Sequence, residues 1–538
     1  MKQLIDGREN GFIKVITGMR RCGKSTLLQV LFRDYLLKQN IPADHIISIA
    51  LDDRINQKLR NPDVLLAYIR QQVRDNQLYF ILMDEIQMVD EFMDVLNSLL
   101  HIENVDVYVT GSNSHFLSND IVTEFRDRSD EIHMYPFSFS EYYAAVGGDK
   151  QGAWKDYYTY GGLPHVLTLV GDKKKSDYLY NVYRKTYLTD IKERHEIKEH
   201  EFQELAKMLS SFIGSSCNPN KLTNTFKSKE NVDLSYPTVV KYISYLKDSF
   251  LIEEAERYDI KGRKYIGSLS KYYFCDLGVR NSILNFRQQE ENHIMENVLY
   301  NELRMRGYNV DIGMIDVKRK IDGKSIRQQY EVDFVVNEGS DRYYIQSAFA
   351  MPNIEKERQE KTSFSFINDS FKKIIVVKDD IKPKRDEQGI VTIGLLDFLL
   401  DKDSLKLLLM EPECKVAFLT WYQANKITAD RIINDLKKQS FEAVMHLYAY
   451  TAKSLKLEHI VSQRDFPILF SNNYTRVGDT IVTAIVFLFS EGNMSFIRLN
   501  RIKNTLKYWL VGGNLYETLV SKIIVKTDEA RERLAKNA

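Results

Sequence analysis

The sequence is poor in cysteine, and its charges almost cancel. Its four cysteines, Cys22, Cys217, Cys275 and Cys414, lie far apart, so none has the spacing of a zinc knuckle or a CxxC motif. We therefore expect reduced thiols in a reducing cytoplasm and no disulfide framework. The formal net charge of +1 provides no global basic field that would attract nucleic acid or an anionic membrane, so any DNA contact requires a local basic patch.

Long apolar runs are also missing. The stretch 481–489 is apolar, but it is much shorter than the ~20 residues that a membrane-spanning helix needs. Residues 1–10 have no apolar core after their basic residue, which argues against a signal peptide. We find no internal repeat and no low-complexity tract in the 538 residues, a length that suits three or four domains of ~150 residues. These features predict a cytoplasmic globular protein with no membrane partner.

The first 145 residues alternate short apolar segments with amphipathic ones. The amphipathic segment 25–37 predicts a helix, because its apolar residues fall on one side. The apolar segments predict buried strands over residues 12–17, 46–51, 78–84 and 105–110. Near-continuous apolar strands that alternate with helices are typical of a parallel sheet covered on both faces. We therefore predict an α/β fold that begins with a P-loop NTPase sheet core.

The stretch TGMRRCGKSTLL, residues 17–28, contains the pattern GxxxxGK[ST] between a predicted strand and a predicted helix. In this pattern the glycines let backbone N–H groups surround phosphates, Lys24 reaches the β- and γ-phosphates, and Ser25 binds Mg²⁺. The alternative, a glycine-rich turn with a solvated lysine, does not account for the strand and the helix on either side. The residues predicted to bind the nucleotide are Gly18, Met19, Arg20, Arg21, Cys22, Gly23, Lys24, Ser25 and Thr26.

Polar residues follow two other predicted strands. Asp84 and Glu85 end the stretch YFILMDEIQ, where Asp84 can hold the Mg²⁺ shell and Glu85 can orient or deprotonate the attacking water. In VTGSNS, Ser112 or Asn113 can contact the γ-phosphate or that water. The alternatives are an acidic turn after the first strand and a capping turn after the second.

Two arginines in the stretch EFRDRSDE, Arg126 and Arg128, are candidates for an arginine finger that acts in a neighbouring subunit of a homo-oligomer. The alternative is an ordinary surface arginine in a weak ion pair. The sequence has no NKxD motif for guanine, and its Asp-Glu pair is unusual for a small-molecule kinase. We therefore predict a Mg²⁺-dependent ATPase with ATP and Mg²⁺ as cofactors.

Beyond the turn-rich stretch YTYGGLP, the pattern changes to helices. Residues 201–213 and the segment that begins at Ser235 predict two helices, and two strand-like runs follow. Two helices and a hairpin outline a winged helix-turn-helix. Its second helix is predicted to expose Lys241, Tyr245 and Lys247, which can contact double-stranded DNA, although a solvated face explains them as well.

Five stretches, GMRRCGKSTLL, ILMDEIQ, VTGSNSHFLS, YPFSFSEYY and YGGLP, together resemble a widespread prokaryotic family that pairs an AAA-type ATPase core with a C-terminal domain of unknown function. The resemblance covers residues 1–401 and implies ATP binding and hydrolysis. It also implies a winged helix followed by a restriction-endonuclease-like fold. Where the family often has Gly-Arg-Gly, this chain has Asp127, Arg128 and Ser129, so the arginine remains and the glycines do not.

A nuclease of the PD-(D/E)xK type needs carboxylates for Mg²⁺ and a lysine that helps to activate water. Glu296 is one such carboxylate, and Asp333 shares a strand face with Glu331 at period two. On the next strand Gln346 takes the place of the second acid, and Ala348 takes the place of the lysine. An amide is a weaker Mg²⁺ ligand and alanine transfers no proton, so we predict a nuclease-like fold that binds or supports rather than cleaves.

The predicted function is a nucleotide-driven switch or motor that acts on double-stranded DNA or on a DNA-bound protein partner. Two alternatives stay open: a nucleotide-gated protein–protein switch with little turnover, and an ATP-regulated nuclease. The predicted domains are an AAA-type core (1–145), a helical linker or lid (146–200), a winged-helix-like domain (201–285), a restriction-endonuclease-like domain without activity (286–402) and a mixed C-terminal region (403–538).

Overall fold

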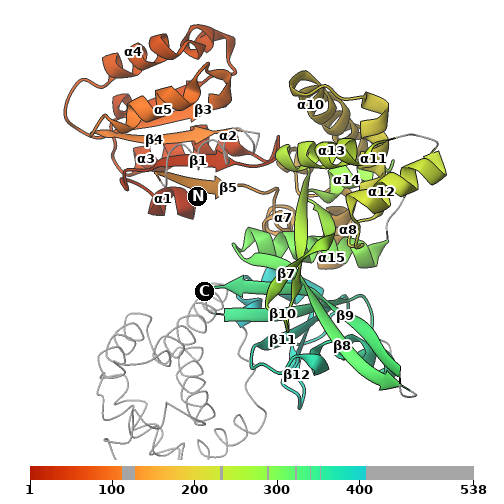
Figure 1. Cartoon of the computed structure of the whole chain (residues 1–538). Helices are drawn as coiled ribbons and strands as arrows, with labels where there is room; N and C mark the ends of the chain where they lie inside the picture. Colours follow the sequence, from red (N-terminus) through yellow and green to blue (C-terminus); the bar gives the residue numbers. More distant parts are fainter. Residues whose placement is uncertain are drawn as a thin grey trace, which may run out of the picture. The chain divides into compact units, whose positions relative to one another are not determined.

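The computed structural model describes residues 1–111, 128–230, 234–287, 290–321, 324–339, 341–351 and 353–406 (Figure 1). The chain forms two compact units: Met1–Lys382 with Ile390–Asp401, and Pro383–Gly389 with Lys402–Ala538. The described part of the second unit contains the short strand β12 (Lys384–Arg385) and a helical turn at Ser404–Lys406. The predicted C-terminal region 403–538 therefore lies almost entirely outside the described residues.

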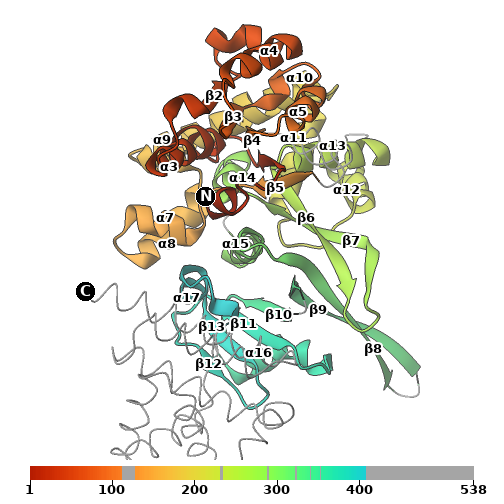
Figure 2. The ribbon, with the colours of Figure 1, turned by 90° about the vertical axis from the view of Figure 1, so that its left-hand side faces the viewer.

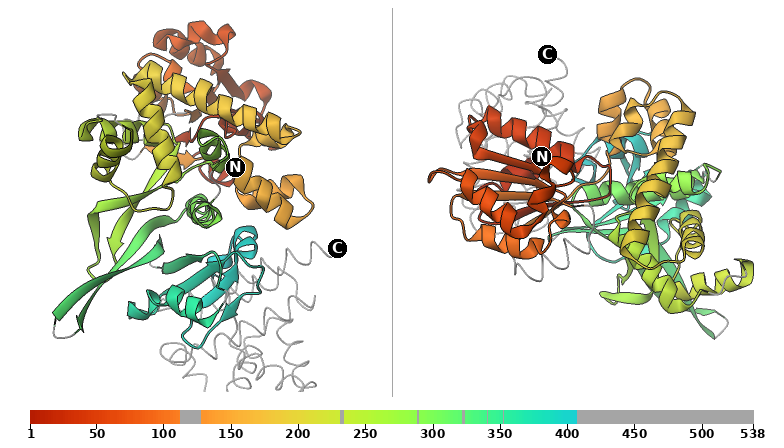
Figure 3. Two further views of the ribbon diagram at one scale, coloured as in Figure 1. Left: turned by 90° about the vertical axis from the view of Figure 1, so that its right-hand side faces the viewer. Right: turned by 90° about the horizontal axis from the view of Figure 1, so that it is seen from above.

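A parallel sheet forms the N-terminal part of the first unit, with the strand order β2-β3-β4-β1-β5 (Figure 3). Its strands are β1 (Ile13–Thr17), β2 (Ile46–Ala50), β3 (Tyr79–Asp84), β4 (Val105–Thr110) and β5 (Ser129–His133). Four of them lie where the apolar segments predicted strands. β5 was not predicted, because a polar strand at the edge of a sheet leaves no apolar run in the sequence.

Helices cover both faces of this sheet, as predicted. They are α1 (Lys2–Asp6), α2 (Lys24–Thr26), α3 (Arg33–Lys38), α4 (Pro62–Gln72) and α5 (Phe92–Leu100). Side chains from α4 and α5 form one apolar cluster with residues such as Ile81 and Val15. Leu28, Phe32 and neighbours form the other cluster on the opposite side of the strands. The helix predicted over residues 25–37 is present, with a π-helical segment at Leu27–Phe32.

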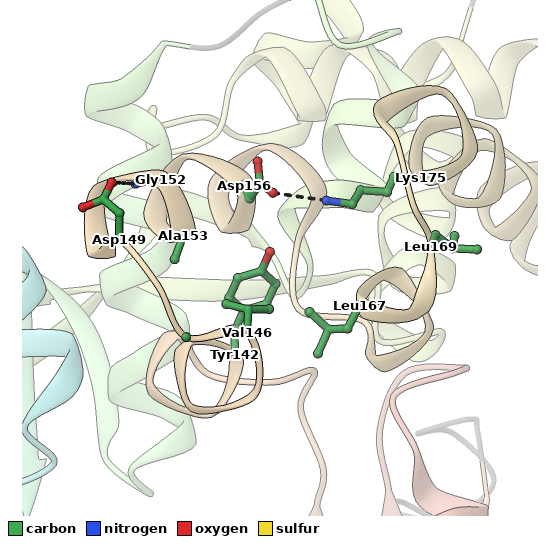
Figure 4. Close-up of a pocket in the computed structure, with 10 residues that line it drawn as sticks. Tyr142, Val146, Asp149, Gly152, Ala153, Asp156, Leu167, Leu169 and Lys175 are labelled. Atoms are coloured by element: carbon green, nitrogen blue, oxygen red, sulfur yellow. Dashed lines mark hydrogen bonds and ion pairs between the residues drawn. The ribbon is translucent and has the colours of Figure 1, made fainter.

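A mostly helical segment follows the sheet. Its helices are α7 (Phe139–Val146), α8 (Lys150–Tyr160), α9 (Asp172–Asn181), α10 (Thr189–Arg194), α11 (Glu199–Ser211), α12 (Pro219–Thr225), α13 (Tyr236–Asp248) and α14 (Leu277–Ile283). A capping box starts α7, because Ser138 and Glu141 each accept a hydrogen bond from the other's backbone N–H. A pocket of about 310 Å³ lies between α7, α8 and α9, where Lys175 pairs with Asp156 at 3.2 Å (Figure 4).

The YGGLP turn is fixed by a buried carboxylate. Gly161 has φ = 76°, and a Cβ on Gly162 would lie 2.3 Å from the carbonyl oxygen of Phe137, so neither position suits a side chain. Asp276 caps α14 and accepts hydrogen bonds from the N–H groups of Gly162 (2.8 Å) and Val279 (2.9 Å). Burial raises the pKa of Asp276 to about 6, although these hydrogen bonds oppose the shift.

We expect Asp276→Asn to change how stability depends on pH. Because the pKa of Asp276 is raised from 3.8 to about 6 in the folded chain, the unfolded chain loses its proton first as the pH rises, so this group lowers stability progressively from about pH 4 and by its full amount above pH 6. The difference between the two pKa values corresponds to roughly 3 kcal/mol. Urea denaturation should show the variant gaining stability relative to the native chain between pH 4 and pH 7. An equal difference at both pH values would contradict this assignment.

A second, mixed sheet contains strands in the order β13-β11-β10-β9-β8-β6-β7 (Figure 2). These strands are β6 (Ile252–Asp259), β7 (Lys264–Phe274), β8 (Asn309–Ile321), β9 (Lys324–Glu338), β10 (Asp341–Ala348), β11 (Lys372–Val377) and β13 (Val391–Gly394). The accompanying helices are α15 (Glu291–Met305), α16 (Ile354–Lys361) and α17 (Leu395–Leu400). β6 pairs in parallel with β8, so the sheet continues across the predicted boundary between residues 285 and 286.

No helix in the described part of the chain combines the length and the hydropathy that crossing a membrane requires.

Candidate nucleotide-binding site

The glycine-rich loop joins β1 to α2 and adopts a conformation that requires its glycines. Gly18 has φ = 137° and Gly23 has φ = 108°. A Cβ on Gly18 would lie 2.1 Å from the carbonyl oxygen of Met134, so no side chain fits there. The backbone is thereby free to turn closely around a ligand, as a phosphate-binding loop must.

Lys24 lies buried at the start of the helix that follows the loop. Its ammonium group donates hydrogen bonds to the carbonyl oxygens of Gly18 (2.9 Å) and Met19 (3.0 Å). These contacts hold a positive charge over the loop, beside backbone N–H groups at a helix N-terminus. Among the other predicted loop residues, Met19 and Cys22 are buried, whereas Arg21, Ser25 and Thr26 are exposed.

Asp84 and Ser25 bring two oxygen ligands together beside the loop. Asp84 is buried at the end of β3 and accepts a hydrogen bond from the Thr110 hydroxyl. Burial raises the pKa of Asp84, and hydrogen bonds from Thr110 and Ser25 oppose that shift. A carboxylate and a hydroxyl in hydrogen-bond contact are the hard oxygen donors that Mg²⁺ takes in phosphate sites, so these residues fit the ion.

Glu85 follows Asp84 in a left-handed conformation with φ = 55°, which is uncommon for a residue with a side chain. Its N–H donates to the Thr110 hydroxyl at 2.9 Å, and its carboxylate contacts the Gln87 amide. The strand end thus turns sharply and gives the two adjacent carboxylates different surroundings: Asp84 is buried and Glu85 is half-buried.

The loop residue Arg20 contacts two residues of α10 that the sequence did not indicate, Asp190 directly and Arg194 through Asp190. Asp190 on α10 accepts from Arg20 (3.2 Å) and pairs with Arg194 (3.1 Å). Burial lowers the pKa of Arg194, and the negative charges of Asp190 and Glu85 oppose this, so Arg194 lies within electrostatic reach of Glu85. No local pattern could have found this cluster, because about 170 residues separate Arg20 from Asp190.

Of the remaining predicted residues of this site, the structure describes Arg128. Ser112, Asn113 and Arg126 lie outside the described residues. Arg128 is exposed and precedes β5, whose register pairs Ser129 with Ile13 at the far end of β1 from the loop. Five strand residues at about 3.3 Å each therefore separate Arg128 from the loop of its own chain, too far for direct contact with a phosphate bound there.

The carboxylates of the predicted second site surround a lysine. Lys271 on β7 pairs with Glu296 (2.8 Å) and Glu331 (2.7 Å), and Asp333 lies 3.9 Å away. The three carboxylates raise the pKa of Lys271, whereas burial and the charge of Glu296 raise the pKa of Asp333. Gln346 lies on the neighbouring β10.

Glu296 and Asp333 of the predicted second site therefore lie near the same lysine, which the sequence did not indicate. Tyr273 donates to Glu296 at 2.6 Å, and the N–H of Ser347 donates to Asp333 at 2.7 Å. Within the described ranges, no group of three or more histidine, cysteine, aspartate or glutamate side chains could hold a metal ion.

The predicted DNA-contacting face of α13 is corrected at one residue. Tyr245 is buried rather than exposed, because its ring stacks on His195 with 3.7 Å between ring centres. Lys247 is half-buried and pairs with Glu254 at 2.6 Å. Lys241 is exposed as predicted.

Comparisons with known proteins match two segments of the chain. A family model described as an AAA domain matches residues 10–143, and one described as a domain of unknown function matches residues 151–290. The first segment contains β1, the glycine-rich loop and the Asp84–Glu85 pair.

One relative and one solved structure extend the comparison. An uncharacterized protein of Methanocaldococcus jannaschii is 28% identical over 376 residues, which are 66% of this chain and 79% of that protein. The structure of the Aeropyrum pernix ORC1 protein in complex with DNA aligns at 12% identity over 53% of this chain and 91% of its own, with a TM-score of 0.23. A TM-score this low establishes no common fold.

A second relative is an uncharacterized protein of Haemophilus influenzae. It is 32% identical over 408 residues, which are 74% of this chain and 97% of that protein. The chain therefore belongs to the same family as this Haemophilus influenzae protein, and its N-terminal part is a nucleotide-binding AAA domain of the P-loop ATPase type.

Proposed function

We propose that the chain is a Mg²⁺-dependent ATPase that works as a nucleotide-driven switch or motor on double-stranded DNA or on a DNA-bound partner. The observation that carries the ATPase part is the meeting of Lys24, Ser25 and Asp84 at one end of the parallel sheet. Lys24 would bind the β- and γ-phosphates, and Ser25 and Asp84 would hold Mg²⁺, which neutralises charge on the phosphates when bound.

Hydrolysis needs a group that positions or deprotonates water, and we assign this role to Glu85. It extends from the same strand end as Asp84, and the N–H group beside its side chain is held by Thr110. The nucleotide would displace the Lys24 ammonium from the loop carbonyls that it now contacts, because phosphate oxygens are stronger acceptors for a cation.

The contact between the loop and α10 supports a switch. Arg20 belongs to the loop, and its partner Asp190 belongs to the proposed lid, residues 146–200. A phosphate bound by the loop would compete with Asp190 for the positive charge of Arg20. Binding and release of the nucleotide would then change the contact between the loop and α10. A protein partner could respond to the resulting change in the position of α10.

The DNA part of the proposal rests on α12, α13 and the β6–β7 hairpin, which we assign to a winged helix in residues 201–285 because two helices precede the hairpin. Lys221, Lys227 and Lys241 are exposed on or beside these helices and could contact phosphates. The restriction-endonuclease-like domain of residues 286–402 would then support this domain without cleaving DNA, because Lys271 on the adjoining strand β7 holds the carboxylate of Glu296. We propose that residues 403–538 are a separate C-terminal region of the chain.

The test is steady-state ATP hydrolysis by the full chain with and without duplex DNA, with Lys24→Ala as the blank. We expect duplex DNA to raise turnover several-fold and the effect to fade as salt rises, because phosphate contacts release counterions. A Lys221→Ala/Lys241→Ala variant should lose the DNA effect and keep the basal rate. Turnover that ignores DNA would favour the nucleotide-gated protein–protein switch instead.

A further inference from the structure

A cleft of about 870 Å³ lies beside the N-terminal sheet, in the size range of small-ligand and peptide sites. β5 forms one wall with Glu131 and His133, which point the same way because side chains alternate along a strand, and Tyr135 extends this wall two residues beyond the strand. The start of β6 forms a second wall, and α15 with the start of β8 forms a third. The site for phosphates described above lies at the glycine-rich loop and shares none of these lining residues.

The lining of this cleft is strongly acidic. The lysine and the arginine of the lining are already engaged: Lys247 pairs with Glu254 at 2.6 Å, and Arg304 pairs with Glu253 at 3.0 Å. The lining carboxylates are Glu131, Asp248, Glu253, Glu254, Glu256 and Asp311.

Three of the carboxylates lack a matching cation. Within the described part of the chain, no ion pair neutralises Glu131, Glu256 or Asp311. Burial raises the pKa of Asp311, and repulsion from Glu256 adds to this shift, whereas a hydrogen bond from Tyr265 and the charges of Arg304 and Arg342 oppose it. A ligand with several positive charges would relieve that repulsion.

Aromatic rings complete the lining. Tyr135 and Tyr300 stand next to the carboxylate of Glu253, to which both donate hydrogen bonds (2.8 and 3.2 Å). Phe250 and Tyr265 add two more rings. Rings beside carboxylates are the combination that holds guanidinium and ammonium groups, through ring faces and charged hydrogen bonds together. We propose that this cleft binds an organic polycation, namely a peptide segment rich in arginine or lysine, or a free polyamine with the same charged groups.

Thr17 joins the cleft to the glycine-rich loop through its hydroxyl group and its backbone carbonyl. Thr17, the last residue of β1, donates to Glu131 at 2.8 Å and lies 3.0 Å from Nδ1 of His133. Its carbonyl oxygen accepts from the N–H of Met134 at 2.8 Å, and Gly18 follows it directly. A cation that binds Glu131 would draw this carboxylate away from Thr17 and loosen the base of the loop, so the ligand would regulate nucleotide turnover. This second step rests on the proposed ATPase function, whereas binding itself does not.

The binding test uses fluorescence anisotropy of a labelled hexapeptide of alternating arginine and glycine with the full chain, in the absence of nucleotide. We expect saturable binding that weakens by about tenfold or more in Glu256→Gln/Asp311→Asn, because two charged contacts are lost. Asp156→Asn, in the separate pocket of Figure 4, is the matched control and should bind like the native chain. A hexapeptide of alternating glutamate and glycine should not bind.

Spermidine separates the two sources of charge. If it displaces the labelled peptide at a lower concentration than the unlabelled peptide does, and the double variant weakens both, the natural ligand is a polyamine; the reverse order indicates a peptide. Equal binding to the native chain and the double variant, or no binding of either ligand, would overturn the proposal. Thermal melting of each variant confirms that it is folded.

The regulatory step is tested separately by Thr17→Val, which removes the hydroxyl group and keeps the shape of the side chain. Peptide affinity should stay near the native value, whereas the change in ATP turnover on adding peptide should disappear. A chain that hydrolyses no ATP would refute the proposed function and leave the binding result standing. Turnover that responds to peptide equally with and without the Thr17 hydroxyl would refute the route through this residue.

Discussion

Replacing Glu85 with glutamine is expected to lower ATP turnover by about 10²- to 10⁴-fold, the usual contribution of a general base. The amide cannot accept a proton from water, but it keeps the size of the carboxylate and leaves Lys24, Ser25 and Asp84 in place. Binding of ATP with Mg²⁺ should therefore change only a few-fold. Single-turnover hydrolysis and equilibrium binding of a fluorescent ATP analogue, measured on the same preparation, separate the two effects.

The matched control is Glu91→Gln. Glu91 also has a left-handed conformation, with φ = 50°, but it is exposed at the start of α5 and should leave turnover unchanged. Arg128→Ala adds a second comparison: if Arg128 is a finger supplied in trans, its loss should lower turnover and spare binding, as the Glu85 variant does. Native turnover in the Glu85 variant would remove Glu85 from the mechanism, and native turnover in the Arg128 variant would reject the finger.

The parts of this site that the sequence predicted are those with a short local pattern. Gly18, Lys24 and Ser25 fall within eight consecutive positions of the motif, and Asp84 ends a strand whose six residues are all buried. Parallel strands place their carboxyl ends at one edge of the sheet, so the loop and Asp84 had to meet there. The short apolar segments likewise predicted four strands of the N-terminal sheet.

The parts that the sequence did not predict depend on contacts between distant residues. β5 has the sequence SDEIH, whose single apolar residue gives no strand signal, because its edge position leaves most of its side chains incompletely buried. The pairing of Arg20 with Asp190 spans a sequence separation that no spacing rule covers. Tyr245 was predicted to be exposed on α13, but its ring is buried against His195, which follows the end of α10.

Lys271 is another residue whose contacts the sequence did not predict. Its removal is expected to have a large effect on stability. Lys271→Met would leave the carboxylates of Glu296, Glu331 and Asp333 close together, with the two shortest ion pairs lost. Removing one partner of a buried ion pair costs about 3–5 kcal/mol, because the remaining charge stays desolvated. Hydrogen exchange of the β7 and β9 amides should show local opening that is easier by this amount.

Lys264→Met is the control for this loss, since Lys264 lies on the same strand but is exposed, and it should change the exchange rates little. If the cost comes from unpaired carboxylates, a Lys271→Met/Glu296→Gln/Asp333→Asn variant should recover most of the stability, because two of the three negative charges are gone. Recovery would mean that Lys271 serves to neutralise a cluster that a nuclease would use for metal. Equal instability of the single and triple variants would instead mean that β7 needs the lysine for packing, and the electrostatic account of this sheet would fail.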